Sequence, residues 1–361
     1  MIKSIAAVIT ILITGWSTAS EQSHNMGWEE VSTVVQAPSY QFNGVLLVKK
    51  NEAVLFSLES GSADKEGLTS LTLENKFIAG SITKQMVAAL ALKQVEEGRL
   101  DLHKPITDYG VTASTPGSKA ITCHHLLSHR AAFDSKGKLV SDPDQQFSYS
   151  NYGYHLVGNV LEKVMNQPLQ ENLNKLFAEI GMSDTSYYAG DELSSLRAVN
   201  GLVPGYMRVY GTNYWLPKQH PFQAVRPFPY LYPASAGVIT TVSDLHRWNQ
   251  ALFQGKIVNQ ASLHLMTTPY STNDDHYLSG RVGYGYGIQI SDTPLGQEFS
   301  HAGYVYGYMG LNCYYPEKNL SLIILQNVSE PVLKDNMEWR KYCFRAFLAV
   351  RRKLFDALTV K

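Results

Sequence analysis

The sequence has little cysteine and no excess of charge of either sign. Its 361 residues include 31 lysines and arginines and 31 aspartates and glutamates, so the formal net charge is zero. A nucleic-acid partner, which needs a broad basic surface, is therefore not expected. Three cysteines, Cys123, Cys313 and Cys343, are too few for a disulfide framework, and their odd number leaves at least one thiol free. One bridge is compatible with the sequence, but nothing in it selects the pair.

The sequence also lacks a hydrophobic run long enough to cross a membrane. The apolar stretch at residues 5–13 follows Lys3 and is shorter than the roughly 20 helical residues that span a bilayer. Small residues lead up to Ala19, so the pattern predicts a secretory signal peptide over residues 1–19, with an uncleaved anchor as the alternative. We therefore expect a periplasmic or secreted protein without an integral membrane span after signal removal. The sequence does not determine its oligomeric state.

The composition is suited to a large buried core. Hydrophobic residues make up 44% of the chain and charged residues 17%, which fits one or two domains. Strand patterns occur near both ends, whereas helical periodicity dominates between them. This arrangement predicts an α+β fold with one antiparallel sheet, flanked by helices, into which a mostly helical domain is inserted. The predicted parts are an α/β domain over 20–98 and 280–361 and a mostly helical domain over 99–279.

Local patterns predict the individual elements. Strands are expected at 44–48 and 53–57 around a turn at 49–52, at 284–290, and at 308–315 and 320–326 as a hairpin. Helices are expected from Ser81 to about Glu97, over 151–165, and over about 332–358, whereas residues 20–40 are expected to form a loose lead-in. The stretch 201–235, rich in proline and aromatic residues, is expected to be a loop that either borders the substrate or only fills core.

A serine and a lysine three residues apart stand at the start of the helix expected from residue 81. This spacing is just under one helical turn, so Ser81 and Lys84 share a face. A serine hydroxyl needs a nearby base to become a nucleophile, and a buried amine can be that base because burial lowers its pKa. The same spacing occurs at residues 62–65 and 135–138, but no apolar periodicity follows there. The alternative is that Ser81 is only a helix cap.

A second motif places a phenol and an amide together before the helix at 151–165. Tyr149 near a lysine ammonium is expected to lose its proton more easily, and it can then pass protons to and from Ser81. Asn151 can hold Lys84 and a substrate carbonyl by hydrogen bonds. The alternative is a core tyrosine beside an asparagine cap.

A third motif, His301-Ala302-Gly303-Tyr304, stands in front of a predicted strand. Gly303 lets a ligand approach the backbone closely. The backbone N–H of Tyr304 can be a second oxyanion donor beside that of Ser81, and His301 can donate to a substrate carboxylate. The alternative is a turn glycine beside a surface histidine.

In this order the three motifs resemble the penicillin-recognising serine hydrolases, the family of β-lactamases and penicillin-binding proteins. The Tyr-x-Asn form is similar to the branch with class C β-lactamases, D,D-carboxypeptidases, D-aminopeptidases and related esterases. The phrases that support the resemblance lie at 100–105, 121–129, 240–245 and 284–287. The resemblance covers roughly residues 40–330 and implies a β-lactamase/transpeptidase-like fold.

The resemblance implies an acyl-enzyme mechanism in an exported serine hydrolase. Ser81 would attack a carbonyl, Lys84 and Tyr149 would handle protons, and Asn151, His301, Gly303 and Tyr304 would hold the substrate or its oxyanion. This branch needs no metal or organic cofactor. The implied substrates are small molecules or peptides, namely D-amino-acid peptides or β-lactams. A carboxylesterase of the same fold and a non-catalytic penicillin- or peptidoglycan-binding protein are the alternatives.

One departure from the family pattern concerns His301. β-Lactamases of this branch usually carry a lysine there, a permanent cation that attracts the β-lactam carboxylate. A histidine is mostly neutral at pH 7, since its unperturbed pKa is about 6.5. The sequence therefore puts strong β-lactamase activity in doubt, but not the hydrolysis of peptides or esters.

Two further features have competing interpretations. Cys123 with His124, His125 and His129 suggests a zinc site, but no carboxylate motif accompanies them, and the family phrase at 121–129 explains two of the histidines. The expected helix near the C-terminus is basic, which fits either a solvated outer face or a membrane surface.

Overall fold

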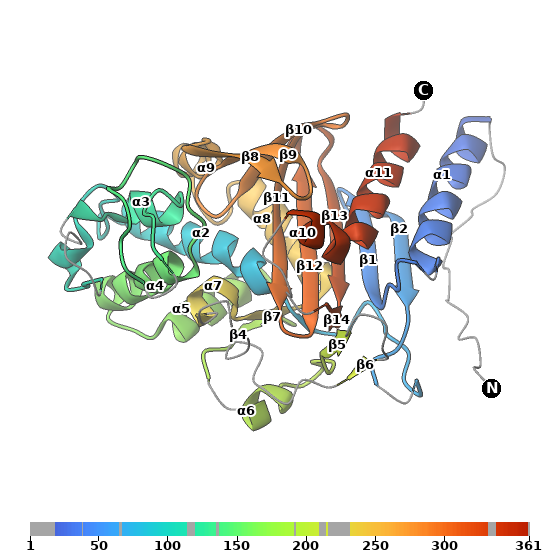
Figure 1. Ribbon diagram of the computed structural model, residues 1–361, viewed down its shortest axis with the longest axis horizontal. Coiled ribbons are helices and arrows are strands. Elements are labelled where there is room, and N and C mark those ends of the chain that lie inside the picture. Colours follow the sequence, from blue (N-terminus) through green and yellow to red (C-terminus); the bar gives the residue numbers. More distant parts are fainter. Residues whose placement is uncertain are drawn as a thin grey trace.

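The computed structural model describes residues 19–37, 39–64, 67–113, 120–134, 137–190, 193–208, 214–215, 232–330 and 337–359. Among these residues, eight strands form one antiparallel sheet in the order β2-β1-β13-β12-β11-β10-β9-β8. Figure 1 shows this sheet between a helical region and a pair of terminal helices. Its strands are β1 Gly44–Lys50, β2 Ala53–Ser60, β8 Ser271–His276, β9 Gly280–Tyr284, β10 Gln289–Thr293, β11 Gly296–Val305, β12 Tyr308–Tyr315 and β13 Leu320–Gln326.

The middle strands are buried on both faces because helices cover each side. Every residue of β12 and β13 is buried, which explains the continuous apolar run of β13. The predicted hairpins are confirmed: β1 pairs with β2, and β12 pairs with β13 across a short 3-10 helix, η4 Pro316–Lys318. The sheet therefore joins strands from both ends of the chain, as the sequence predicted.

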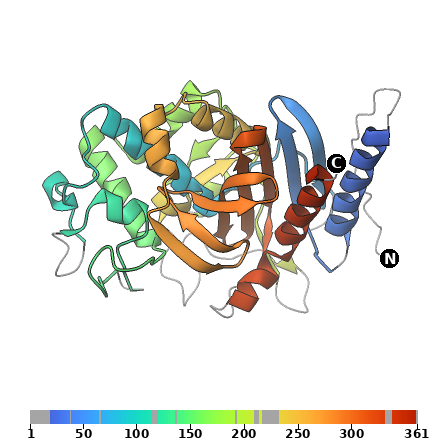
Figure 2. The same ribbon diagram turned by 90° about the horizontal axis from the view of Figure 1, so that it is seen from above.

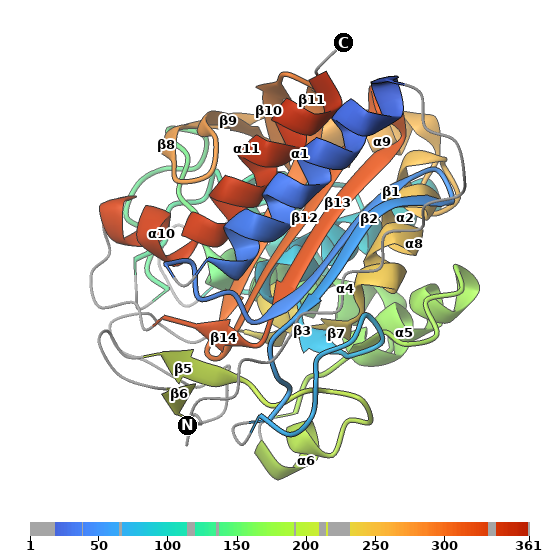
Figure 3. The same ribbon diagram turned by 90° about the vertical axis from the view of Figure 1, so that its right-hand side faces the viewer.

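Two helices from opposite ends of the chain cover one face of the sheet. Figure 3 shows α1 Ala19–Gln36 beside α11 Arg345–Thr359. The expectation of a loose lead-in over 20–40 is therefore wrong. Trp28, Val31 and Val35 form an apolar stripe at helical spacing, which the polar composition of this stretch concealed. Trp28 stacks on Phe56 of β2, with ring centroids 5.2 Å apart.

The expected single helix over 332–358 is also wrong. The chain forms α10 Met337–Cys343 and then α11, while residues 331–336 lie outside the described part. The basic side chains of these helices have mixed surroundings. Arg351 is buried, whereas Arg352 is exposed. No helix in the described ranges is long and apolar enough to cross a bilayer.

The strand expected at 284–290 is two strands with a turn between them. β9 ends at Tyr284, and β10 begins at Gln289. Gly287 in this turn has φ +70°, and a Cβ there would lie 2.5 Å from the carbonyl oxygen of Lys84. The turn therefore packs directly against the first turn of α2 Thr83–Glu96, at a distance that only glycine permits.

The other face of the sheet is covered by α2 and α8 Val242–Phe253, and the helical region extends from there (Figure 2). The helix α8 lies in the range predicted for the helical domain, but it packs against β1 and β13 of the sheet. The division predicted at 98/99 and 279/280 stays a prediction. The other helices are η1 Gly80–Ile82, η2 Ile106–Tyr109, α3 Cys123–Leu127, α4 Asn151–Met165, α5 Leu169–Glu179, α6 Leu193–Arg197, α7 Pro233–Ala236 and α9 Gln260–Thr267.

Short strands connect the helical region to the sheet. They form two small three-stranded sheets, β14-β5-β6 and β3-β7-β4. Most of the expected loop at 201–235 lies outside the described residues, as do residues 1–18 of the predicted signal peptide. The bounds of the short strands are β3 Phe77–Ile78, β4 Ser186–Tyr187, β5 Tyr206–Arg208, β6 Tyr214–Trp215, β7 Val238–Thr240 and β14 Val328–Ser329.

Candidate active site

Ser81 lies at the entrance to the central helix α2, in the 3-10 turn η1. The turn follows β3 and touches β11. Gly80 has φ +57°, and a Cβ there would lie 2.8 Å from the backbone nitrogen of Tyr304. Glycine is therefore required at the position before the serine. Ser81 itself is 8% exposed, and the positive end of the α2 dipole lies beside it.

The amine of Lys84 is buried among oxygen atoms. Lys84 has no exposed surface, and its Nζ lies 2.9 Å from Ser81 Oγ, 2.9 Å from Asn151 Oδ1 and 3.1 Å from the Ser235 carbonyl oxygen. Burial without a carboxylate among these partners holds the pKa of Lys84 well below its ordinary value of 10.5. The amine is therefore suited to being neutral before a reaction begins.

The hydrogen-bond partners of Lys84 determine the role of its lone pair. A neutral amine has two N–H donors and one lone pair. The amide oxygen of Asn151 and the carbonyl of Ser235 can only accept, so they take both N–H groups. When the amine is neutral, its lone pair is left for the Ser81 hydroxyl, whose oxygen lies 2.9 Å away, so this hydroxyl can donate to it. This is the arrangement that a general base requires.

Tyr149 lies next to Lys84 but remains partly open to solvent. Lys84 Nζ is 4.7 Å from the centre of the Tyr149 ring, and Tyr149 is 42% exposed. The helix α4 begins directly afterwards, with Ser150 as its cap, because the Ser150 hydroxyl accepts the N–H of Gly153 at 3.0 Å. The predicted helix over 151–165 is confirmed; its first residue, Asn151, and Tyr149 just before it both contact the Lys84 amine.

The pKa of Tyr149 moves in the direction opposite to the one expected from the sequence. Desolvation by the surrounding protein raises this pKa above its ordinary value of 10, and it outweighs the hydrogen bond with Ser81, which lowers it. The expectation of an easily formed phenolate assumed a lysine ammonium nearby. Because burial favours the neutral amine of Lys84, no strong opposite charge stabilises a phenolate. Tyr149 therefore stays a phenol near pH 7.

His301 is buried, and both of its ring nitrogens have protein partners. Nδ1 lies 2.7 Å from the carbonyl oxygen of Ala302, which can only accept, so Nδ1 carries the hydrogen. Nε2 then accepts from the Tyr284 hydroxyl at 2.9 Å. Burial lowers the pKa of His301 to about 3. In this conformation His301 is neutral and has no donor left for a substrate carboxylate, contrary to the role expected for it.

The edge of β11 closes the site opposite Ser81. β10 pairs with β11 only as far as Ser300, so residues 301–305 keep β12 on one side and face η1 on the other. A Cβ on Gly303 would overlap the carbonyl oxygen of Ala79 and lie 3.4 Å from the backbone nitrogen of Ser81. The backbone nitrogens of Ser81 and Tyr304 thus border the same close contact between η1 and β11.

Sequence reasoning missed two contributors to this site. The Ser235 contact is made by a backbone carbonyl, which any residue type carries, so the sequence gives no sign of it. Two hydrogen bonds help to place the short helix α7 that contains Ser235. The Thr83 hydroxyl accepts from Val238 N at 3.0 Å, and Ser235 Oγ donates to the Tyr232 carbonyl at 2.7 Å. In the sequence His129 is a metal candidate and part of the family phrase at 121–129, and neither interpretation indicates a contact with Tyr149. Its ring in fact lies against Tyr149, with centroids 4.3 Å apart.

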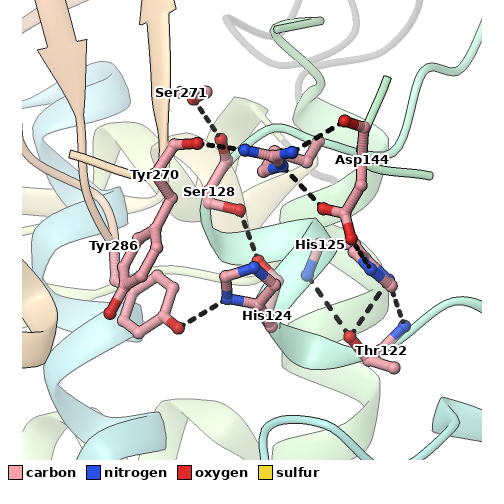
Figure 4. A network of polar contacts seen from close by, with 9 residues as sticks. Thr122, His124, His125, Ser128, Asp144, Tyr270, Ser271 and Tyr286 are labelled. Atoms are coloured by element: carbon pink, nitrogen blue, oxygen red, sulfur yellow. Dashed lines mark hydrogen bonds and ion pairs between the residues drawn. The ribbon is translucent and has the colours of Figure 1, made fainter. Parts of the chain in front are cut away.

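The histidines near α3 bind protein groups. His124 contacts the Tyr286 hydroxyl at 2.7 Å, and His125 contacts Thr122 and Asp144, as Figure 4 shows. Burial raises the pKa of the Cys123 thiol to about 12, which disfavours the thiolate that zinc needs. In the ranges that the structure describes, no three histidine, cysteine, aspartate or glutamate side chains are grouped so that they could hold a metal ion.

Comparison with known proteins gives one consistent family. The family model described as Beta-lactamase matches residues 29–342. Penicillin-binding protein 4* of Bacillus subtilis (strain 168) is 24% identical over 325 residues, covering 81% of this chain and 69% of that protein.

Two solved structures share the fold. D-amino acid amidase from Ochrobactrum anthropi SV3, complexed with L-phenylalanine amide, has TM-score 0.73 and 19% identity, covering 93% of this chain and 99% of that one. EstCE1, described as a hydrolase with promiscuous acyltransferase activity, has TM-score 0.72 and 19% identity, covering 94% and 100%. At these identities the likeness shows the fold alone.

Proposed function

Since the chain belongs to the beta-lactamase family, we propose that it is an exported serine hydrolase that forms an acyl-enzyme on Ser81. The single observation that carries this proposal is the position of the Lys84 amine. It lies 2.9 Å from the Ser81 hydroxyl, it is buried, and its two other partners are oxygen acceptors. A lysine held in this way is costly to bury and serves no ion pair with these partners, which supports a catalytic role.

The proposed reaction proceeds in two halves. Ser81 Oγ attacks the substrate carbonyl carbon while its proton moves to Lys84 Nζ, and the backbone N–H groups of Ser81 and Tyr304 bind the oxyanion. Tyr149, as a phenol, gives its proton to the leaving group and regains one from Lys84. In the second half the neutral amine of Lys84 takes a proton from water as the water oxygen attacks the acyl carbon, and a proton passes from Lys84, directly or through the Tyr149 hydroxyl, to Ser81 Oγ as the bond between Oγ and the acyl carbon breaks. The products are the free acid, the released amine or alcohol, and the regenerated serine.

The proposed substrates are D-amino-acid peptides or β-lactams. The similarity to a penicillin-binding protein in sequence and to a D-amino acid amidase in fold supports this class. A carboxylesterase is the second candidate, because one observation favours it. His301 is neutral, and both of its nitrogens are engaged, so it offers no charge to a carboxylate beside the scissile bond. An ester or a primary amide has no such carboxylate.

Three substrates and one variant test these proposals. The protein and its Ser81→Ala variant are incubated with fluorescent penicillin, with a D-Ala-D-Ala peptide and with p-nitrophenyl esters. Mass spectrometry of the penicillin-treated protein looks for an acyl adduct on Ser81. Turnover of the D-peptide or the penicillin supports the first candidate, and rapid ester turnover without a penicillin adduct supports the second. No labelling and no turnover with any of them would refute the hydrolase.

Export is a separate part of the proposal. It rests on the charge, apolar run and small residues of positions 1–19. Expression in a Gram-negative host, followed by cell fractionation and N-terminal sequencing, tests it. Release of a chain that begins near residue 20 supports export, and a chain that remains uncleaved in the cytoplasm contradicts it.

A further inference from the structure

His129 occupies an unusual position directly behind Tyr149. It follows α3, it is 1% exposed, and its backbone has φ +56°, a left-handed conformation that is uncommon for residues other than glycine. The proposed chemistry does not use this residue. A buried titratable side chain on a strained backbone next to a reactive phenol is a reason to look for a role, because such strain persists only where the surroundings enforce it.

Both neighbours of Tyr149 in the chain are hydrogen-bonded to this one histidine. The N–H of Ser148 donates to the carbonyl oxygen of His129 at 2.8 Å, and the N–H of Ser150 donates to its Nδ1 at 3.2 Å. Tyr149 is therefore held from both sides by a residue 20 positions earlier in the sequence. Because Ser150 also caps α4, the same contact fixes the start of the helix that carries Asn151.

The ring of His129 also supports the ring of Tyr149. Their centroids are 4.3 Å apart, and Tyr284 lies on the histidine as well, at 4.6 Å. Since Nδ1 accepts a hydrogen bond, the neutral ring carries its hydrogen on Nε2. This Nε2 has no hydrogen-bond partner among the described residues. The tautomer therefore allows the hydrogen bond from Ser150 to Nδ1 and leaves the hydrogen on Nε2 without an acceptor there.

The residue after His129 anchors this arrangement to the rest of the fold. Arg130 pairs with the carboxylate of Asp144 at 2.6 Å and donates to the carbonyl oxygens of Asp144 and Tyr270. His125 contacts the same carboxylate at 3.1 Å, and Ser271 donates to the Ser128 carbonyl at 2.7 Å (Figure 4). The backbone at 128–130 is thus fixed to α3, to the segment leading to Tyr149 and to the start of β8.

We propose that His129 is a positioning residue for Tyr149. Its carbonyl and Nδ1 hold the backbone on both sides of Tyr149, and its ring supports the phenol beside Lys84 and Ser81. The proposal rests on the proposed function, because Tyr149 must take part in proton transfer for its position to matter.

Two substitutions of His129 and one control separate its features. Asparagine tolerates a left-handed backbone and places its amide oxygen near the position of Nδ1, so His129→Asn keeps the acceptor. His129→Leu removes the acceptor and fills the position with an apolar side chain. His246→Leu is the matched control: His246 is 2% exposed, with one ring nitrogen bonded to Ser321 at 3.1 Å and the other unpartnered among the described residues, but it lies on α8.

The kinetic test is a double-mutant cycle with Tyr149→Phe, using p-nitrophenyl ester or D-peptide hydrolysis. His129→Leu should lower kcat about 10- to 100-fold with little change in KM, because a misplaced proton donor slows the chemical step. In the Tyr149→Phe background the same change should alter kcat less than about 2-fold. His246→Leu should keep the activity, and His129→Asn, which keeps the acceptor but not the ring, should lose less activity than His129→Leu. Equal fold losses in both backgrounds, or a fully active His129→Leu, would overturn the proposal.

A second measurement does not depend on turnover. Hydrogen–deuterium exchange of a peptide spanning 147–152 should become faster in His129→Leu, and it should be unchanged in His129→Asn and His246→Leu. If the wild type hydrolyses and labels nothing, the proposed function fails, and exchange still decides whether His129 holds this segment. If exchange in His129→Leu equals that of the wild type, His129 does not position Tyr149.

Discussion

Two buried basic side chains, Lys84 and Arg351, lie in helices on opposite faces of the same sheet. Lys84 belongs to α2, and Arg351 belongs to α11 (Figure 2). Both are nearly inaccessible, at 0% and 8% exposed. Arg351 Nε donates to a carboxylate oxygen of Glu298 at 2.8 Å, whereas the three nearest partners of Lys84 are a hydroxyl, an amide and a backbone carbonyl.

The partner, rather than burial itself, decides what each side chain does. Desolvation lowers the pKa of Arg351, but the Glu298 carboxylate, together with Cys313 and Tyr315, raises it by more, so the guanidinium stays charged and joins α11 to β11. Lys84 is removed from water and has no carboxylate among its three nearest partners, so its pKa is lowered. A buried basic side chain that is paired with a carboxylate therefore stays charged and stabilises the fold. One without a carboxylate loses its proton more easily and can act as a base.

The largest effect is expected from removing the base. Lys84→Met should lower the acylation rate of Ser81 by about 10³-fold or more, because the serine proton then has no acceptor. Stopped-flow measurement of ester hydrolysis checks this, and Arg351→Met is the matched control. Acylation within 10% of the wild type in Lys84→Met would contradict the role assigned to this amine.

The same variant tests the sign of the pKa shift. A lysine whose pKa is lowered by folding destabilises the fold at pH values below its unfolded pKa, because the unfolded chain binds the proton more tightly. The free energy of unfolding of the wild type relative to Lys84→Met should therefore rise as the pH rises toward 10.5. Urea unfolding at several pH values measures this difference, and a difference that falls as the pH rises would show that Lys84 is charged in the fold.

Removing the paired cation should affect stability instead of activity. Arg351→Met leaves the Glu298 carboxylate buried beside Tyr315, whose hydroxyl donates to it at 2.6 Å, so the loss should be about 3–5 kcal/mol. Adding Glu298→Gln should recover most of this loss, because the charge is gone and an acceptor remains. Urea unfolding measures the loss. A single variant that is as stable as the double variant would mean that the pair is not a charged unit.

Much of the fold could be predicted because local patterns specify it. The β1–β2 and β12–β13 hairpins and the helix α4 follow from alternation or helical periodicity, and the structure has them near the predicted positions. The helix α1 was missed because its stripe of Trp28, Val31 and Val35 is narrow, and its partner α11 lies at the other end of the chain. Contacts between distant segments leave no mark on local composition.

The candidate site also has a part that the sequence predicts and a part that it does not. The spacing of Ser81 and Lys84 predicts their contact, because one helical turn brings them together. The carbonyl of Ser235 and the contact of His129 with Tyr149 depend on how separate segments pack. The direction of the Tyr149 pKa shift could not be predicted either, because it depends on whether Lys84 carries a charge, and burial decides that.

Two buried histidines, like Lys84, lack a counter-charge among the described residues, and they should make the stability of the fold depend on pH in the acid range. Burial lowers the pKa of His276 and of His301 to about 3, below the ordinary value of 6.5. The unfolded chain therefore binds protons that the folded chain does not, and stability is lost as the pH falls from about 6.5 toward 3. Each such histidine should contribute about 1.4 kcal/mol per pH unit within this range. Thermal unfolding between pH 7 and 5 measures the slope, which His276→Gln should reduce; an unchanged slope would contradict this assignment.

The smallest effect is expected from a cation that is paired but exposed. Lys353 lies one half-turn beyond Arg351 on α11, and its Nζ contacts the Glu30 carboxylate of α1 at 2.6 Å. Both side chains reach solvent, with 31% and 58% of their surface exposed, so water and salt screen the pair. Lys353→Ala should leave the midpoint of urea unfolding within experimental error, since Trp28, Val31 and Val35 join α1 to this face. A loss as large as that of Arg351→Met would mean that a carboxylate partner stabilises a cation here regardless of burial.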